Sequence, residues 1–212
     1  FIDTDRATLA KRRAMGFGVK KATIMIPSLE KRADLLAMLK DELNRQILIC
    51  GASLDDVEII EDVDDGLMTI GEKRNRLRKR AKGLYTAYFD DDDMPFERYI
   101  EHNLNGIAAR ADCVGLIGVL TEGGQNPEVF EHSIKHKLWE TNHAEKYPAI
   151  KHVRPPNHLN WIKGSITRRF KFQEINHGED HIWSTQLLES GLIKTEHAVN
   201  EPIYQYLFNR NK

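Results

Sequence analysis

Four consecutive aspartates, Asp90 to Asp93, follow directly on an apolar stretch, residues 84–89, that has the composition of a buried strand. Adjacent carboxylates repel one another and are costly to remove from water. A hard divalent cation with oxygen ligands removes that cost and also holds phosphate oxygens. The plain alternative is a solvated acidic turn. Position favours a binding site, because the carboxyl end of a strand in an α/β sheet faces the crevice where ligands bind.

Strand-like and helix-like segments alternate through the first half of the chain. Residues 22–27 form a short β-rich run closed by a proline, and Ser28 is placed to cap the amphipathic helix that follows. A second strand over residues 57–60 leads into a second acidic turn, residues 61–65. This alternation predicts a βαβ unit with a parallel sheet, in which both acidic strand ends converge on one crevice.

The most basic segment of the chain predicts a helix. It spans residues 71–82 and is expected to stop at Gly83. Lys73 and Arg74 lie in its first turn, where free backbone N–H groups and the helix dipole also favour an anion such as a diphosphate. The remaining basic residues are too many for one buried face, so we expect them to face solvent.

The second half is less regular. Residues 95–107 predict a helix that begins at its proline, and residues 113–120 predict another buried strand. A later helix opens at the tripeptide Gly178-Glu179-Asp180. For Asp180 alone, a helix-capping role is the plain alternative to a chemical one.

Composition fits one globular domain, because 212 residues with 41% hydrophobic and 30% charged side chains are ordinary for that class. The net charge of −1 offers a polyanion no general attraction. No stretch is long and apolar enough to span a membrane, so we expect a soluble, cytoplasmic protein, although a start at Phe1 is compatible with a fragment. Cys50 and Cys113 lie in apolar surroundings without CxxC spacing, which predicts buried free thiols.

Taken together and in this order, five motifs resemble those of the GT-A glycosyltransferases, particularly the family 2-like enzymes. They are residues 24–28, residues 57–60 with the acidic turn, residues 71–75, residues 89–93 and residues 178–180. The resemblance covers roughly residues 22–207 and implies an α/β, Rossmann-like GT-A domain with a mixed, mainly parallel central sheet flanked by helices. It divides the chain into an arm or linker (1–21), a nucleotide-binding half (22–120) and an acceptor-binding half (121–212).

The resemblance also implies a nucleotide site built by the loop after the first strand, an acid after the second strand and the start of the basic helix. In the family that acid usually follows the strand at once. Here several acids are within reach, so Asp62, Asp64 and Asp65 remain alternatives for contact with the base. The residues implied in nucleotide-sugar binding are Pro27, Ser28, Asp62, Asp64, Lys73, Arg74, Asp90 and Asp91.

A metal site and a catalytic base follow from the same resemblance. The run Asp90 to Asp92 is similar to the DxD motif that binds Mn²⁺ or Mg²⁺ on the diphosphate, and Asp93 is an alternative ligand because four adjacent acids leave the register open by one. His197 is similar to a late histidine that completes the metal site in some members. The plain alternative for this residue is a structural role. Asp180 stands where inverting members keep the general base, with Glu179 as the neighbouring candidate.

The implied activity is metal-dependent, inverting transfer of a sugar from a nucleotide-diphosphate donor to an acceptor hydroxyl, with a UDP-sugar as the expected donor. Glycan, lipid, protein and modified nucleic acid all remain open as acceptors. A sugar-nucleotide nucleotidyltransferase is the nearest enzymatic alternative, disfavoured because no glycine-rich loop follows the first strand. The second alternative is a non-catalytic module that binds a metal or a nucleic acid. The usual Ca²⁺-loop pattern is absent, because no glycine follows Asp93.

Overall fold

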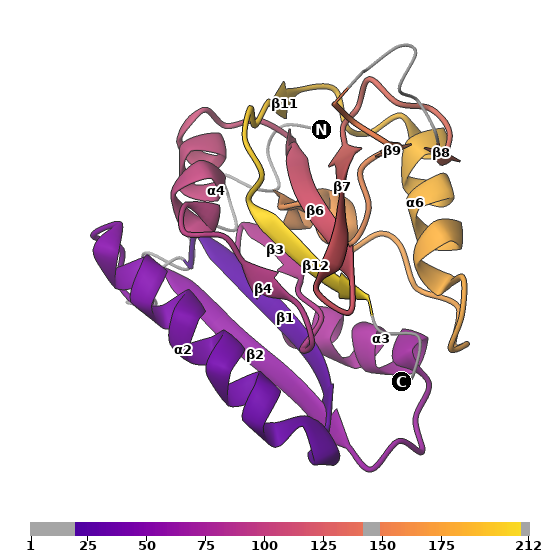
Figure 1. Ribbon diagram of the computed structural model, residues 1–212. Coiled ribbons are helices and arrows are strands. Elements are labelled where there is room, and N and C mark those ends of the chain that lie inside the picture. Colours follow the sequence, from indigo (N-terminus) through magenta and orange to yellow (C-terminus); the bar gives the residue numbers. More distant parts are fainter. Residues whose placement is uncertain (1–19, 142–148, 209–212) are drawn as a thin grey trace.

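The computed structural model describes residues 20–141 and 149–208 and shows two six-stranded sheets with helices on their flanks (Figure 1). The predicted arm over residues 1–21 lies almost wholly outside the described residues. In spatial order the first sheet contains β11 (Glu196–His197), β5 (Cys113–Val114), β10 (Ile162–Lys163), β3 (Tyr85–Tyr88), β1 (Ala22–Leu29) and β2 (Val57–Asp64). The second contains β4 (Met94–Pro95), β12 (Tyr204–Phe208), β6 (Leu116–Glu122), β7 (Gln125–His132), β9 (His152–Arg154) and β8 (Glu140–Thr141).

The first sheet is mixed, as expected. Its β1 pairs in parallel with both β2 and β3, whereas β10 runs antiparallel between β3 and β5. The second sheet was not anticipated; its centre is the antiparallel β6–β7 hairpin, with β12 parallel to β6 and β9 parallel to β7. Within the described part of the chain, no helix has the length and apolar character needed to cross a membrane.

The helices cover both faces of the first sheet. They are η1 (Glu30–Arg32), α2 (Ala33–Ile49), α3 (Ile70–Arg80), α4 (Tyr99–Ala108), α5 (Gly164–Thr167) and α6 (Glu179–Ser190). Because side chains alternate along a strand, Ile24 and Ile26 of β1 join the core with α2 and the second sheet, whereas Met25 packs with Leu77 of α3 and Trp183 of α6. Figure 1 shows α2 and α6 on opposite flanks of the molecule.

Three predicted element boundaries are wrong. The first strand does not end at its proline: β1 continues to Leu29, and Pro27 is tolerated because β3 pairs with β1 only as far as Met25. The second strand continues through the expected acidic turn to Asp64. Residues 113–120 are two strands in different sheets, separated at Gly115.

Three helix predictions also need correction. Ser28 caps no helix, since η1 intervenes before α2 and neither has a side-chain cap. Pro95 lies in β4, and α4 begins only at Tyr99. The basic helix α3 ends at Arg80; Gly83 is required instead for close packing, because a Cβ there would lie 2.4 Å from the backbone of β1. Of the two thiols, Cys113 is buried as predicted, but Cys50 is exposed.

Candidate functional site

A cavity of about 540 Å³ opens between the carboxyl ends of β1 and β3 on one side and the second sheet on the other. This is the crevice where open α/β sheets bind ligands. The start of α3, the loop before α6 and the first turn of α6 complete its wall. Of the predicted site residues, the cavity is lined by Pro27, Ser28, Lys73, Arg74, Asp90, Asp91, Asp92, Glu179 and Asp180.

Asp91 holds the loop in place. Its Oδ2 accepts a hydrogen bond from Ser28 Oγ at 2.6 Å, and its Oδ1 pairs with Arg32 Nη1 at 2.8 Å. The same Arg32 Nη1 lies 3.4 Å from Asp92 Oδ2. Because both Asp91 oxygens have partners and the residue is only 3% exposed, it fixes β1 against the turn after β3. Arg32, which sequence reasoning missed, is the cation nearest Asp92 in these contacts.

The structure separates Asp93 from the other three aspartates. Asp93 does not line the cavity, and it is 1% exposed. Its Oδ2 accepts from Tyr204 Oη at 2.7 Å and its Oδ1 from the Leu207 amide at 2.8 Å. Burial, reinforced by the charge of Asp90, raises its pKa well above the ordinary value. This geometry favours the register in which Asp90 and Asp92 face a ligand and Asp93 anchors β12.

Arg74 joins the two acidic segments beneath the cavity. Its guanidinium pairs with Glu179 through Nη1 and lies 3.0 Å from Asp90 Oδ1 through Nη2. Burial alone would raise the pKa of Asp90, but the charges and hydrogen bonds of Arg74 and His158 together more than offset it and hold that pKa below its ordinary value. Arg74 was predicted to bind the nucleotide. In the structure its charge is already balanced by these two carboxylates, so it positions the site from below.

The acids of β2 do not reach the cavity. Asp62 is buried and its Oδ2 pairs with Arg76 Nε at 3.1 Å. Asp64 pairs with Lys73, whose Nζ also donates to the Ser28 carbonyl at 2.6 Å. These contacts tie β2 and α3 to the end of β1. Neither acid lines the cavity, so contact of either with a base, as the sequence predicted, would require rearrangement.

Two neighbouring acids open α6 and differ in their surroundings. Glu179 is buried and paired with Arg74, and burial raises its pKa despite that pair. Asp180 is half-buried, lines the cavity, and accepts a hydrogen bond from the His181 amide at 2.8 Å. Gly178 precedes them with φ of 82°, a left-handed conformation that a side chain would strain. Both acids therefore line the cavity, and Asp180 is the more exposed of the two, whereas Glu179 is paired with Arg74.

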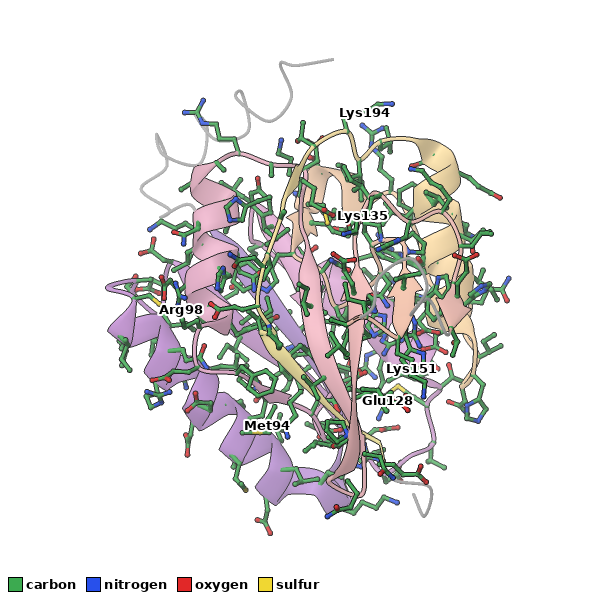
Figure 2. All side chains as sticks on the ribbon, turned by 45° about the horizontal axis from the view of Figure 1, so that its top comes forward. Met94, Arg98, Glu128, Lys135, Lys151 and Lys194 are labelled. Atoms are coloured by element: carbon green, nitrogen blue, oxygen red, sulfur yellow. The ribbon has the colours of Figure 1, made fainter. Side chains whose placement is uncertain are left out.

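The cavity contains residues that sequence reasoning did not select. His132, His152, Arg154, Asn157 and His158 line its second-sheet side. These residues have no characteristic spacing in the sequence, because β7, β9 and the loop after β9 come together only when the two strands pair. At the rim, His152 Nε2 lies 2.8 Å from Glu128 Oε2, and Figure 2 shows Glu128 beside Lys151, with which it also pairs.

A metal ion fits part of the predicted ligand set. Within the described ranges, no group of three His, Cys, Asp or Glu side chains is arranged to hold a metal by itself. Mg²⁺ and similar ions are usually bound by only one or two carboxylates together with substrate phosphates. Asp90 and Asp92 meet that requirement, since both line the cavity and remain partly exposed. His197 lies on β11, away from the cavity lining, so its predicted metal role has no support from its position.

Comparison with known proteins identifies the fold. No protein-family model matches the sequence, and no curated protein matches it. The crystal structure of S. aureus TarS 1-349 in complex with UDP aligns at 13% identity with a TM-score of 0.63, over 89% of this chain and 60% of that one. The same TarS protein in complex with UDP-GlcNAc aligns at 11% identity with a TM-score of 0.60, over 89% and 58%. This chain thus spans less than two thirds of those chains.

Identity this low shows the fold alone. The predicted fold class is confirmed: this is an α/β chain of the GT-A, Rossmann-like kind, with mixed sheets flanked by helices.

Proposed function

We propose that this chain is a metal-dependent, inverting glycosyltransferase that uses a nucleotide-diphosphate sugar. One observation carries the proposal: a single cavity brings the end of β1, the carboxylates of Asp90 and Asp92, and the carboxylate of Asp180 together from three distant segments. Such a cavity has a place for a nucleotide, oxygen ligands for its diphosphate metal and a base for the acceptor. The TarS complexes with UDP and UDP-GlcNAc support a uridine nucleotide on this fold.

The donor lies on the β1 side in this proposal. Apolar side chains of Pro27, Leu29, Met68 and Ile70 line that part of the cavity and offer a surface for a nucleobase. Asp90 and Asp92 would hold Mn²⁺ or Mg²⁺ there. When bound, the ion neutralises the negative charge that builds up on the departing diphosphate. Arg32, close to Asp92, is placed to share that charge.

Asp180 is the proposed general base. In an inverting transfer, the acceptor oxygen forms a bond to the anomeric carbon while the bond from that carbon to the diphosphate oxygen breaks. The acceptor hydroxyl proton passes to a carboxylate, and the nucleoside diphosphate leaves with the electron pair. Asp180 is accessible to the cavity, whereas Glu179 is committed to Arg74. Glu179 therefore positions Arg74 and the helix start.

A binding experiment with matched variants tests the proposal. Calorimetric titration with a panel of sugar nucleotides should detect at least one ligand, with affinity that depends on Mn²⁺. Asp92→Asn should weaken that binding by about tenfold or more, because it removes a charged ligand of the metal. Asp93→Asn is the control: an asparagine can still accept from the Leu207 amide and donate to Tyr204 Oη, so binding should be retained. The proposal fails if no sugar nucleotide binds, or if Asp93→Asn and not Asp92→Asn abolishes binding.

A further inference from the structure

Arg154 is a cation that lines the cavity and has no counter-ion among the residues that the structure describes. It is the last residue of β9 and is half-buried. One face of its guanidinium lies over the Trp139 ring, with Cζ 4.2 Å from the ring centroid. Among the residues that the structure describes, its side chain forms no ion pair or hydrogen bond. Stacking leaves the in-plane N–H groups of a guanidinium free, and these are the groups that grip an oxyanion in pairs.

The charges around Arg154 do not fully compensate for its burial. Burial lowers its pKa, and the charge of Asp180 only partly offsets that cost. No ion pair forms between the two side chains, so the offset acts at a distance. A partly buried cation that keeps its charge without a partner is costly, and an anionic ligand removes the cost.

Unpaired donors lie on the same wall. Asn157 is fully buried and its Nδ2 has no hydrogen-bond partner among the described residues. Its amide orientation is fixed, because Oδ1 accepts from the Leu159 amide at 3.0 Å. Both ring nitrogens of the fully buried His132 lack a partner at full hydrogen-bond geometry in the described part of the chain, although the side chains of Asn157 and Asn160 lie close enough to interact with the ring.

The tautomer of His158 adds a further donor. Its Nε2 lies 3.0 Å from Arg74 Nη2 and 3.7 Å from Asp90 Oδ2. A guanidinium can only donate, so the closer contact makes Nε2 the acceptor and places the proton on Nδ1. That Nδ1 is buried, and no partner for it occurs within the described ranges. In the part of the chain that the structure describes, the second-sheet wall therefore combines the cation Arg154 with buried polar groups that have no hydrogen-bond partner.

We propose that this wall, defined by His132, Arg154, Asn157 and His158, binds an oxyanion, a phosphate or a carboxylate, carried by the acceptor substrate. This inference rests on the proposed function, because it takes Asp180 to be the base that the acceptor hydroxyl must reach. Position supports the assignment to the acceptor, because the Trp139 ring on which Arg154 stacks also contacts the ring of His181, the residue after Asp180, with the ring centroids 4.9 Å apart. The charged surroundings agree with this position. The acids that act on Arg154 are Asp180 and Tyr206. Those that act on Arg32, on the donor side, are Asp90, Asp91 and Asp92.

Titration with inorganic phosphate, and separately with acetate, tests the site without needing any transfer reaction. Calorimetry of the full chain saturated with UDP and Mn²⁺ should show saturable binding of at least one of these anions. Arg154→Gln should weaken it by about tenfold or more, since a charged, paired hydrogen bond is lost. Arg169→Gln, at an exposed arginine with no ion pair among the described residues, should leave it unchanged. Arg154→Lys, which keeps the charge but not the paired donors, should be intermediate, and thermal unfolding confirms that each variant is folded.

Four results would overturn the inference. Absence of saturable binding would do so, as would equal binding by Arg154→Gln. The same titration without UDP gives the third test. Anion binding that depends on Arg154 in the UDP-free chain but disappears when UDP is added would place the diphosphate itself on Arg154. A comparison of UDP-glucuronate with UDP-glucose distinguishes the remaining source: a preference for the uronate that Arg154→Gln removes would move the anion from the acceptor to the donor sugar. Failure of the proposed function would give a different result from failure of this inference: the unmodified chain would bind no UDP-sugar at all.

Discussion

Asp180→Asn is expected to lower the turnover of a sugar nucleotide by about 10²- to 10⁴-fold, the usual contribution of a general base. The change is isosteric and keeps an oxygen that can accept the hydrogen bond from the His181 amide, so the start of α6 should remain intact. Donor affinity should stay within about twofold, because Asp180 is not among the residues proposed to hold the diphosphate. Steady-state kinetics of transfer, or of slow donor hydrolysis where no acceptor is supplied, measures the effect.

Glu179→Gln provides the matched control for this variant. It removes the charge next to Asp180 in sequence, but Glu179 is buried against Arg74 and does not serve as the base in this proposal. Its main effect should be lower stability. The assignment is contradicted if Glu179→Gln abolishes turnover at unchanged donor affinity while Asp180→Asn remains active.

Arg74→Met is expected to lower the free energy of unfolding by about 3–5 kcal/mol, the usual cost of removing one partner of a buried ion pair. Arg74 is 4% exposed and is shared by Asp90 and Glu179. Its loss leaves two carboxylates facing each other without a cation, and methionine restores none of the hydrogen bonds. Urea unfolding of the metal-free chain, compared through its midpoint and slope, gives the difference.

Lys79→Met, on the same helix but exposed, is the control and should change stability by no more than about 0.5 kcal/mol. The effect of Arg74→Met should also depend on pH. In the folded chain Arg74 holds the pKa of Asp90 below its ordinary value of 3.8, so the stabilisation is present above that value and is lost as the pH falls further. The difference in stability between the two chains should therefore begin to shrink as the pH falls below about 4, and it should disappear only as the pH falls through the depressed pKa of Asp90. A cost that is small at pH 7, or that grows on acidification, would contradict this role.

Much of the β1 side of the cavity could be predicted from the sequence, because its signals are local. An apolar strand followed by acids, and a helix start with Lys73 and Arg74, are patterns within a few residues of each other. What local patterns could not give is the partner of each charge. Asp93 looks like its three neighbours, yet its partner Tyr204 lies 111 residues away in sequence. The strand β12 that carries Tyr204 decides that Asp93 anchors the fold.

The second-sheet wall was beyond sequence reasoning for a related reason. Arg154 and His132 are adjacent only because β7 and β9 pair in parallel across an intervening segment. Neither strand has a motif, and a single arginine or histidine predicts nothing by its position. For Arg74 the sequence predicted the position at the start of the helix, but it could not show that the guanidinium pairs with Asp90 and Glu179. Burial and charge pairing are set by tertiary contacts, so neither the second-sheet wall nor the partners of Arg74 could be predicted from local sequence.

The most direct measurement is a crystal structure of this chain with UDP and Mn²⁺. The proposal predicts that the diphosphate and one metal ion occupy the cavity between β1 and the turn after β3, with the ion bound by Asp92, alone or together with Asp90, and with Asp93 still bonded to Tyr204. Nucleotide bound outside this cavity, or a metal held through Asp93 without Asp90 and Asp92, would contradict it.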